Sequence, residues 1–156
     1  MINFYNEDEV RKLKKTNKNN LVIIVILNIV SFIVLLLSFI FIKLNVALFE
    51  AIIFITTILI VCFDIYFIDV IYLYNKMYIK FLTKMVSNKK IQIQVLKFDV
   101  SIAKQTRNNI QINKVLIVND SIEKEVYIES SKVNDFLKMT DISYCFLVDN
   151  FIVGVE

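Results

Sequence analysis

The sequence predicts a membrane protein of the α+β class. The expected architecture is a two-helix transmembrane hairpin, a juxtamembrane helical extension, and a small C-terminal cytoplasmic all-β domain with a barrel-like sheet. Hydrophobic residues make up 57% of the 156 residues, against roughly 45 to 50% in average soluble domains. Two long apolar runs, residues 21–42 and 46–72, lie in the first half of the chain. After residue 91, polarity alternates with the period of two expected for strands.

The first apolar run, residues 21–42, contains no charged side chain. At about 1.5 Å rise per residue, a helix of this length measures about 33 Å, which matches a hydrocarbon core about 30 Å thick. The run is longer than the apolar core of a signal peptide, and no small-x-small cleavage site follows it. Because three residues, 43–45, separate it from the second run, the two helices are expected to form an antiparallel hairpin.

The distribution of positive charge predicts the orientation. Residues 1–20 and residues 73–90 carry five basic side chains each, while the link between the two runs carries one, Lys43. By the positive-inside rule, both termini are expected in the cytoplasm. Residues 1–20 are expected to form a basic helix with Asn6 as N-cap and Glu9 as its capping-box partner. The abundance of Ile, Asn and Lys suggests a bacterial genome of low GC content.

Polar residues within the two runs are candidates for helix pairing or for an ion path. In a hairpin with equal arms, Ser38 lies level with Glu50, and Asn28 lies within one turn of Asp64. Unpaired polar atoms are costly in lipid, so helix pairing is the preferred interpretation. The alternative is an ion path through Glu50, Asp64 and Asp69, because acidic residues in membrane spans are candidates for function.

Residues 73–90 are expected to continue the second helix as an amphipathic juxtamembrane helix. Apolar side chains recur there at spacings of three and four, and the apolar face is too wide for the seam of a two-stranded coiled coil. The helix is expected to lie either in the membrane interface or against protein. The residues expected at this interface are Tyr72, Tyr78, Ile79 and Leu82.

Residues 91–156 are expected to form five short strands and a short helix that is capped by Ser130 or Ser131. Turns are expected at residues 107–109, 119–121 and 149–150. A domain of about 66 residues has a marginal core, so support from the membrane helices or from further copies is expected. Seven basic and nine acidic residues give it a net charge of −2, which disfavours nucleic-acid binding. The acidic side chains, Glu129 included, are expected at solvated positions.

The residue content excludes several kinds of catalytic machinery. The chain has no histidine, which excludes a Ser-His-Asp triad and a HExxH zinc site. The single glycine, Gly154, excludes a P-loop and a dinucleotide fingerprint. Cys62 and Cys145 are expected to be packed free thiols. We therefore expect no enzymatic activity, no catalytic residue, no cofactor and no metal.

These features predict a non-enzymatic accessory or scaffold module whose β-domain meets a partner at the cytoplasmic face of the cell membrane. The expected partners are the lipid bilayer and either further copies of the chain or a larger membrane protein. Two alternatives remain. One is an oligomeric pore or transport subunit that uses Glu50, Asp64 and Asp69. The other is an immunity protein that protects its host membrane from a toxin or bacteriocin.

Overall fold

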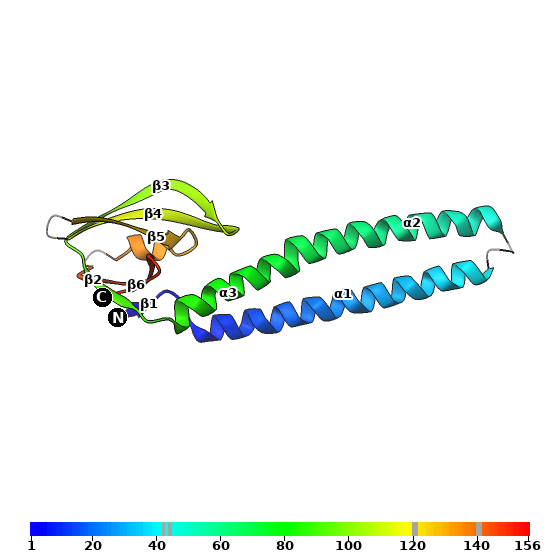
Figure 1. Ribbon diagram of the computed structural model, residues 1–156, viewed down its shortest axis with the longest axis horizontal. Coiled ribbons are helices and arrows are strands. Elements are labelled where there is room, and N and C mark those ends of the chain that lie inside the picture. The colour runs from blue at the N-terminus through cyan, green and yellow to red at the C-terminus, as the bar shows by residue number, and fades with distance from the viewer. Residues whose placement is uncertain (42, 44, 120–121, 140–141) are drawn as a thin grey trace. The chain divides into compact units, whose positions relative to one another are not determined.

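The chain folds into two compact units. The computed structural model describes residues 1–41, 43, 45–119, 122–139 and 142–156. The elements are β1 (Ile2–Asn3), α1 (Glu7–Phe41), α2 (Val46–Ile65), η1 (Tyr66–Leu73), α3 (Tyr74–Ser87), β2 (Ile91–Gln94), β3 (Lys97–Arg107), β4 (Ile110–Asn119), β5 (Ile122–Glu129), α4 (Val133–Leu137), β6 (Tyr144–Val148) and β7 (Phe151–Val155) (Figure 1). Residues 1–12 and 77–156 form the sheet unit, and residues 13–76 form the helix-pair unit.

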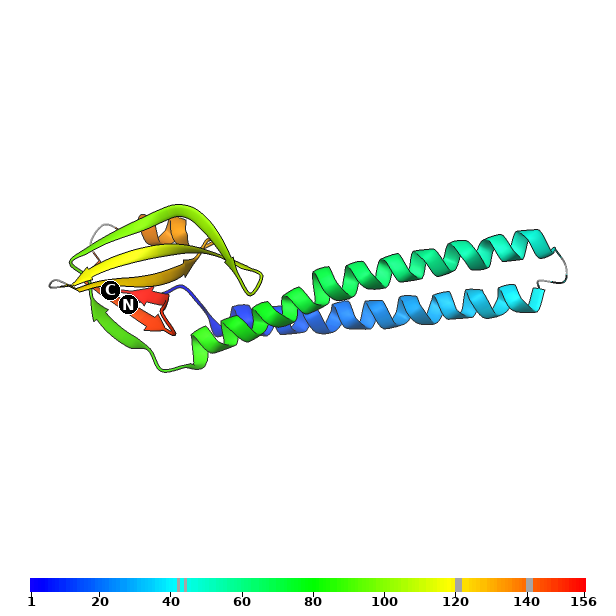
Figure 2. The ribbon, with the colours of Figure 1, turned by 45° about the horizontal axis from the view of Figure 1, so that its top comes forward.

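The helix-pair unit contains most of α1 and the helix that follows it, which run antiparallel side by side (Figures 1 and 2). α1 is 35 residues long and α2 is 20 residues long. The backbone remains helical from Val46 to Ser87, because the π-helical turns of η1 connect α2 directly to α3. Both long helices are apolar enough and long enough to cross a membrane. The predicted end of the second span, near residue 72, lies within η1.

Asparagine side chains cap the start of both long helices. The backbone N–H of Asp8 donates to Oδ1 of Asn6 at 3.1 Å, which confirms Asn6 as the N-cap of α1. The N–H of Leu48 donates to Oδ1 of Asn45 at 3.2 Å and caps α2 in the same way. The carboxylate of Glu9, predicted to complete a capping box, lies 3.9 Å from the Lys132 ammonium.

The described strands of the sheet unit form one mixed sheet in the order β2-β6-β7-β5-β4-β3, with β1 beside β7. All pairs are antiparallel except β5 and β7, which run parallel and meet at Tyr127 and Phe151. β1 lies so close to β7 that a Cβ atom on Gly154 would be 2.7 Å from the carbonyl oxygen of Ile2. The one glycine of the chain therefore permits this close approach of two backbones.

The sheet is open, so the barrel-like prediction is wrong. The edge strands β2 and β3 are separated by two residues, yet they do not pair with each other in the described structure. Val95 donates its N–H to the carbonyl of Ser143 at 2.9 Å, and Leu96 donates to Val118 at 3.0 Å, so the chain crosses from one edge to the other here. The alternation of residues predicts which face of a strand is buried, but it does not predict whether two edges pair.

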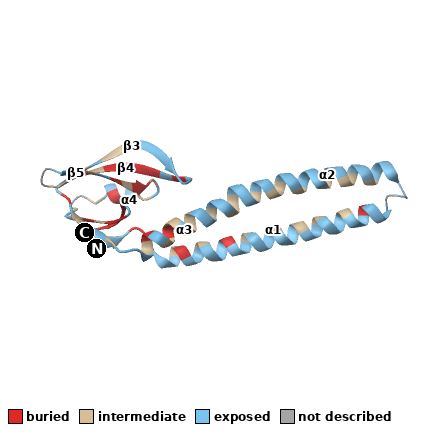
Figure 3. Cartoon of the chain, viewed as in Figure 1, coloured by how far each residue is buried: buried red, intermediate tan, exposed pale blue. Residues whose placement is uncertain are grey.

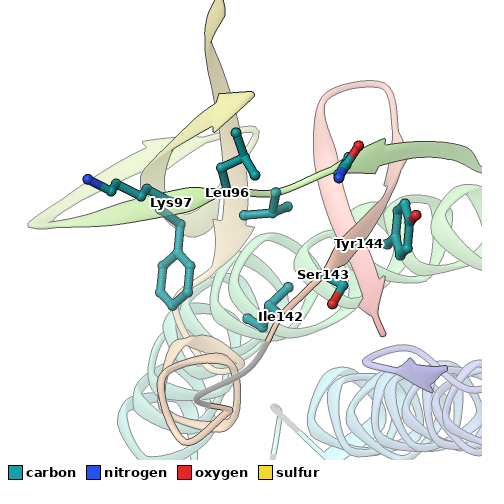
Figure 4. Close-up of a pocket in the computed structure, with 8 residues that line it drawn as sticks. Leu96, Lys97, Ile142, Ser143 and Tyr144 are labelled. Carbon is teal, nitrogen blue, oxygen red and sulfur yellow. The ribbon is translucent and has the colours of Figure 1, made fainter. Parts of the chain in front are cut away.

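A wide hollow of about 680 Å³ lies where the two edges diverge (Figure 4). Its lining comes from the link between β2 and β3 and from the start of β6, and consists of Gln94, Val95, Leu96, Lys97, Phe98, Ile142, Ser143 and Tyr144. The chain between β2 and β3 is thus accessible to solvent, as expected for an open sheet.

The core of the sheet unit takes side chains from helices as well as strands (Figure 3). Ile112, Val115 and Ile117 of β4 are at most 1% exposed, and the last two alternate with half-buried neighbours. Leu82 of α3 is fully buried, and Phe136 of α4 is fully buried between aromatic neighbours. The all-β description is therefore too narrow, because helical residues complete the core that the strands alone leave small.

Two hairpin turns lie where the sequence predicts them. Asn108 and Asn109 join β3 to β4 with φ of 52° and 62°, and Asp149 and Asn150 join β6 to β7 with φ of 47° and 66°. Two successive residues with positive φ make a type I′ turn, for which asparagine and aspartate are favoured. Of the turn predicted at 119–121, Asp120 and Ser121 lie outside the described residues.

The predicted serine cap of α4 is wrong. The residue before α4 is Lys132, and its side chain makes no capping hydrogen bond. The hydroxyl of Ser130 donates to Oδ1 of Asn113 at 2.6 Å, and that of Ser131 donates to Glu129 at 2.6 Å. Both serines therefore bond to strand residues, because polar groups buried near the sheet need partners more than an exposed helix end does.

The left-handed backbone at Asn150 predicts a specific response to substitution. Its carbonyl accepts from the N–H of Tyr127 at 2.8 Å, which fixes the turn in place. Asn150→Val should lower the free energy of unfolding by about 1–2 kcal/mol, because a β-branched residue is strained at positive φ. Asn150→Gly should be neutral or slightly stabilising. Thermal unfolding of the full chain in detergent, followed by circular dichroism, compares the two; equal losses would contradict the argument.

Candidate functional site

The first candidate surface is the outside of the helix-pair unit, which is apolar from Leu21 to Phe41 of α1 and along most of α2. In the most apolar stretch of α1, 6% of the residues are buried. In the most apolar stretch of the second helix, none is buried. Single side chains are exposed to a degree unusual for their size, such as Ile40 and Phe54, each at 68%. Apolar surface costs about 25 cal/mol per Å² in water, and large continuous patches mark contact with lipid or protein. The two helices are therefore long and apolar enough to suit a membrane.

One polar contact crosses between the two helices. Nδ2 of Asn28 donates to Oδ1 of Asp64 at 2.8 Å, and the same amide donates to the carbonyl of Ile24 at 3.1 Å. An apolar groove of about 550 Å³ runs beside this contact, lined by Ile24, Val25, Asn28, Ile29, Phe32, Leu35 and Ile60. Because the bond is directional, it fixes which faces of α1 and α2 meet and at what register.

Among the described residues, no hydrogen bond joins Ser38 to Glu50. The hydroxyl of Ser38 donates to the carbonyl of Val34 in its own helix at 2.9 Å. Glu50 and Asp69 are exposed, and Asp69 lies in η1. Glu50 and Asp64 are separated by 14 residues of helix, or about 21 Å. A single copy therefore does not bring the three carboxylates of the ion-path interpretation to one place.

The predicted interface residues of the juxtamembrane helix lie in two environments. Tyr72 is half-buried in η1. Leu82 is fully buried, Ile79 is half-buried, and the hydroxyl of Tyr78 donates to Oε1 of Glu129 at 2.9 Å. For Tyr78 and Leu82, the surface against which they pack is the protein's own sheet unit rather than lipid.

The second candidate site is the Glu129 cluster, which we define as Tyr5, Tyr78, Glu129 and Ser131. Glu129 is 6% exposed at the end of β5, so its prediction as a solvated side chain is wrong. One carboxylate oxygen accepts from the hydroxyls of Tyr78 and Ser131. The ring of Tyr5 packs edge-on against Phe81 with centroids 6.0 Å apart. The cluster joins the N-terminal segment, α3 and β5.

Burial and charge act together on Tyr5. Burial of the phenol, followed by the nearby negative charge of Glu129 and by Tyr78, raises the pKa of Tyr5 above its ordinary value of 10.0. The ammonium of Lys132 lies 6.0 Å from the centre of the Tyr5 ring, a cation–π distance. The Tyr5 phenol therefore keeps its proton near neutral pH.

The cysteines are free and lie far apart in the sequence. Cys62 is exposed on α2, and Cys145 is buried in β6. Burial raises the pKa of Cys145 to about 12, so its thiol stays protonated and is a poor nucleophile. Within the described ranges, no three side chains of Cys, Asp and Glu gather as a metal site requires.

Sequence reasoning missed Tyr5 and Glu129 for a physical reason. Glu129 stands in an alternating strand, where an acidic residue normally faces solvent, and its donor Tyr78 is 51 residues away. β1 contains two residues, which is too short for any periodic pattern. Local sequence carries no signal of either contact.

Comparisons with protein-family models, curated proteins and solved structures gave no match for this chain. Its function is therefore inferred from the residues described above.

The Glu129 cluster predicts a loss of stability when a donor is removed. Tyr78→Phe should lower the free energy of unfolding by about 1.5–3 kcal/mol, because the buried carboxylate loses a charge-assisted hydrogen bond. Tyr144→Phe is the matched control, since Tyr144 is exposed on β6, and should change stability by less than about 0.5 kcal/mol. Urea unfolding of the two variants measures the difference. Equal losses of stability in the two variants would contradict a stabilising hydrogen bond from Tyr78 to Glu129.

The raised pKa of Tyr5 predicts a specific pH dependence. Above about pH 10 the unfolded chain releases the Tyr5 phenol proton while the folded chain retains it. The contribution of Tyr5 to the free energy of unfolding is therefore lost as pH rises, by about 1.4 kcal/mol per pH unit. Tyr5→Phe should remove that part of the decline. The buried thiol of Cys145 adds its own pH dependence from about pH 9 upward, but this is the same in the parent chain and in Tyr5→Phe. Unfolding midpoints at pH 9, 10 and 11 should therefore diverge; parallel curves would refute the assignment.

Proposed function

We propose that this chain is a membrane-anchored accessory or scaffold module without catalytic activity of its own. In this proposal the apolar runs at residues 21–42 and 46–72 cross the cell membrane as a hairpin. The sheet unit lies at the cytoplasmic face, where it binds a partner. The observation that carries the proposal is the exposure of apolar side chains along residues 21–41 of α1 and along α2.

The pairing of β1 with β7 supports an even number of membrane crossings. Ile2 pairs with Val155 and Asn3 with Gly154, so the N-terminal strand and the C-terminal strand belong to one sheet. An open sheet cannot span a bilayer, because the backbone groups at its unpaired edges would have no partners in the hydrocarbon. Both ends of the chain must then lie on the same side, as a hairpin requires.

The charge distribution supports the cytoplasm as that side. Residues 1–20 and 73–90 carry five basic side chains each, against one at Lys43 between the helices. Positively charged flanks are retained in the cytoplasm during insertion.

The edges of the sheet support a role in binding. β3 is 11 residues long and pairs with β4 on one side, and β2 pairs with β6 on one side, in the described structure. Unpaired strand edges are templates for an added strand from another chain. Large apolar side chains are also exposed on this unit, at Ile91, Leu96, Ile122 and Leu137. We propose that an extended segment of a partner protein, or of a second copy, adds to one of these edges.

The bond between Asn28 and Asp64 favours the module over a pore. It gives Asp64 a partner within one copy of the chain, as expected for a carboxylate that serves helix pairing.

Membrane insertion and orientation can be measured together. In a Cys62→Ala background, Lys43→Cys should react with an impermeant maleimide applied to intact cells, while Glu123→Cys should react after the membrane is permeabilised. The remaining thiol, Cys145, is buried and should stay unlabelled in the folded protein. The chain should also resist extraction by alkaline carbonate. Release by carbonate would overturn the membrane anchor, and a reversed labelling pattern would overturn the orientation.

A further inference from the structure

The sheet unit has a groove with an apolar floor that the proposed function does not use. It has a volume of about 420 Å³ and lies between α3, the β3–β4 turn and the β6–β7 turn. Its floor is formed by Phe81, Met85, Ile110 and Phe151. The rings of Phe81 and Phe151 meet edge-on with centroids 5.1 Å apart, which makes this floor part of the packed core. We call it the basic groove, for the residues at its rim.

The rim of the basic groove is positively charged. Lys80, Lys84 and Arg107 line it, and the one acidic side chain in its lining is Asp149, which forms an ion pair with Lys84. The lining therefore carries a net charge of +2, although residues 91–156 carry a net charge of −2. The groove is therefore positively charged, although most of the sheet around it belongs to a segment of net negative charge.

Two of the three positive groups of the rim have partners in the described structure: Lys84 pairs with Asp149, and Arg107 lies over the Tyr127 ring. Lys80 and Lys84 are one helical turn apart and lie on the same side of α3. The guanidinium of Arg107 lies 5.9 Å from the centre of the Tyr127 ring, within cation–π distance. Arg107 also ends β3 directly before the rigid type I′ turn at 108–109. A site whose groups are already ordered loses less entropy on binding.

The geometry points to the basic groove as a binding site for a phosphate-bearing anion with an attached apolar part. The planar guanidinium of Arg107 suits two oxygens of one phosphate, and the two ammonium groups supply further donors. The apolar part would cover the floor at Phe81 and Phe151. On binding, Lys84 exchanges the carboxylate of Asp149 for the phosphate, so Asp149 keeps the lysine oriented in the empty groove.

This ligand chemistry has two possible sources. One is the headgroup of an anionic phospholipid; α3 continues the helix that carries the second apolar run, and lysines follow that run directly at Lys76 and Lys80. The other is a soluble organic phosphate. Assignment to a lipid rests on the proposed membrane anchor, whereas the phosphate site itself does not.

The test uses the full chain in a neutral detergent. Native mass spectrometry compares retention of dioleoyl phosphatidylglycerol with that of dioleoyl phosphatidylcholine, and calorimetry titrates glycerol 3-phosphate. The groove variant is Lys80→Gln with Arg107→Gln, two exposed positions. The matched control, Lys104→Gln with Lys124→Gln, removes the same charge from the sheet unit outside the groove. A third variant, Lys80→Arg, preserves the charge and leaves the guanidinium of Arg107 in place, so it reports on local damage at position 80.

We expect the groove variant to bind its anion roughly tenfold more weakly, while the control and the charge-preserving variant retain most of the affinity. Preference for phosphatidylglycerol over phosphatidylcholine assigns the site to lipid, and binding of glycerol 3-phosphate alone assigns it to a soluble phosphate. Absence of binding to both anions, or an equal loss in the control, overturns the site. Carbonate extraction separates the two proposals: binding of glycerol 3-phosphate by a chain that carbonate releases retains the groove and rejects the anchor.

Discussion

Burial of one face of α3 against the sheet is the contact on which the rest of the structure depends. Leu82 and Met85 are at most 2% exposed, and they fill the core beneath strands that supply too little apolar surface by themselves. The same helix places Tyr78 on the buried carboxylate of Glu129 and Lys84 on Asp149. Loss of this packing would therefore remove the cluster and the basic groove together. α3, which continues the second apolar run, is therefore also part of the sheet unit that follows it.

The features that the sequence predicts well are those determined by neighbouring residues. The turns at 108–109 and 149–150 have the expected backbone because asparagine and aspartate tolerate positive φ wherever they occur. The helix cap at Asn6 is equally local. The contact between Asn28 and Asp64 is longer in range, but a link of three residues constrains the two helices enough for simple counting to bring these side chains within one turn.

The features that the sequence does not predict depend on distant parts of the chain. Closure of the sheet requires two edges to meet in register, and the alternation of IQIQ and its successors is the same in an open sheet and in a barrel. Burial of Glu129 depends on Tyr78 and on an N-terminal segment more than 120 residues away. Ser130 and Ser131 follow the rule for helix caps, yet polar groups of Asn113 and Glu129 compete for them. In each case tertiary contacts override a sound local preference.

The pairing of β1 with β7 has a consequence for the order of events during synthesis. The two strands are roughly 150 residues apart, so at 5 to 20 residues per second β1 leaves the ribosome about 8 to 30 s before its partner exists. The helix pair is complete about halfway through that interval, while Phe4 and Tyr5 have no finished core to enter until its end. Closure of such a long-range pair is slow, and β7 lies in the middle of the sheet. The nascent chain therefore presents an unprotected apolar N-terminus to chaperones and proteases until its last strand is released.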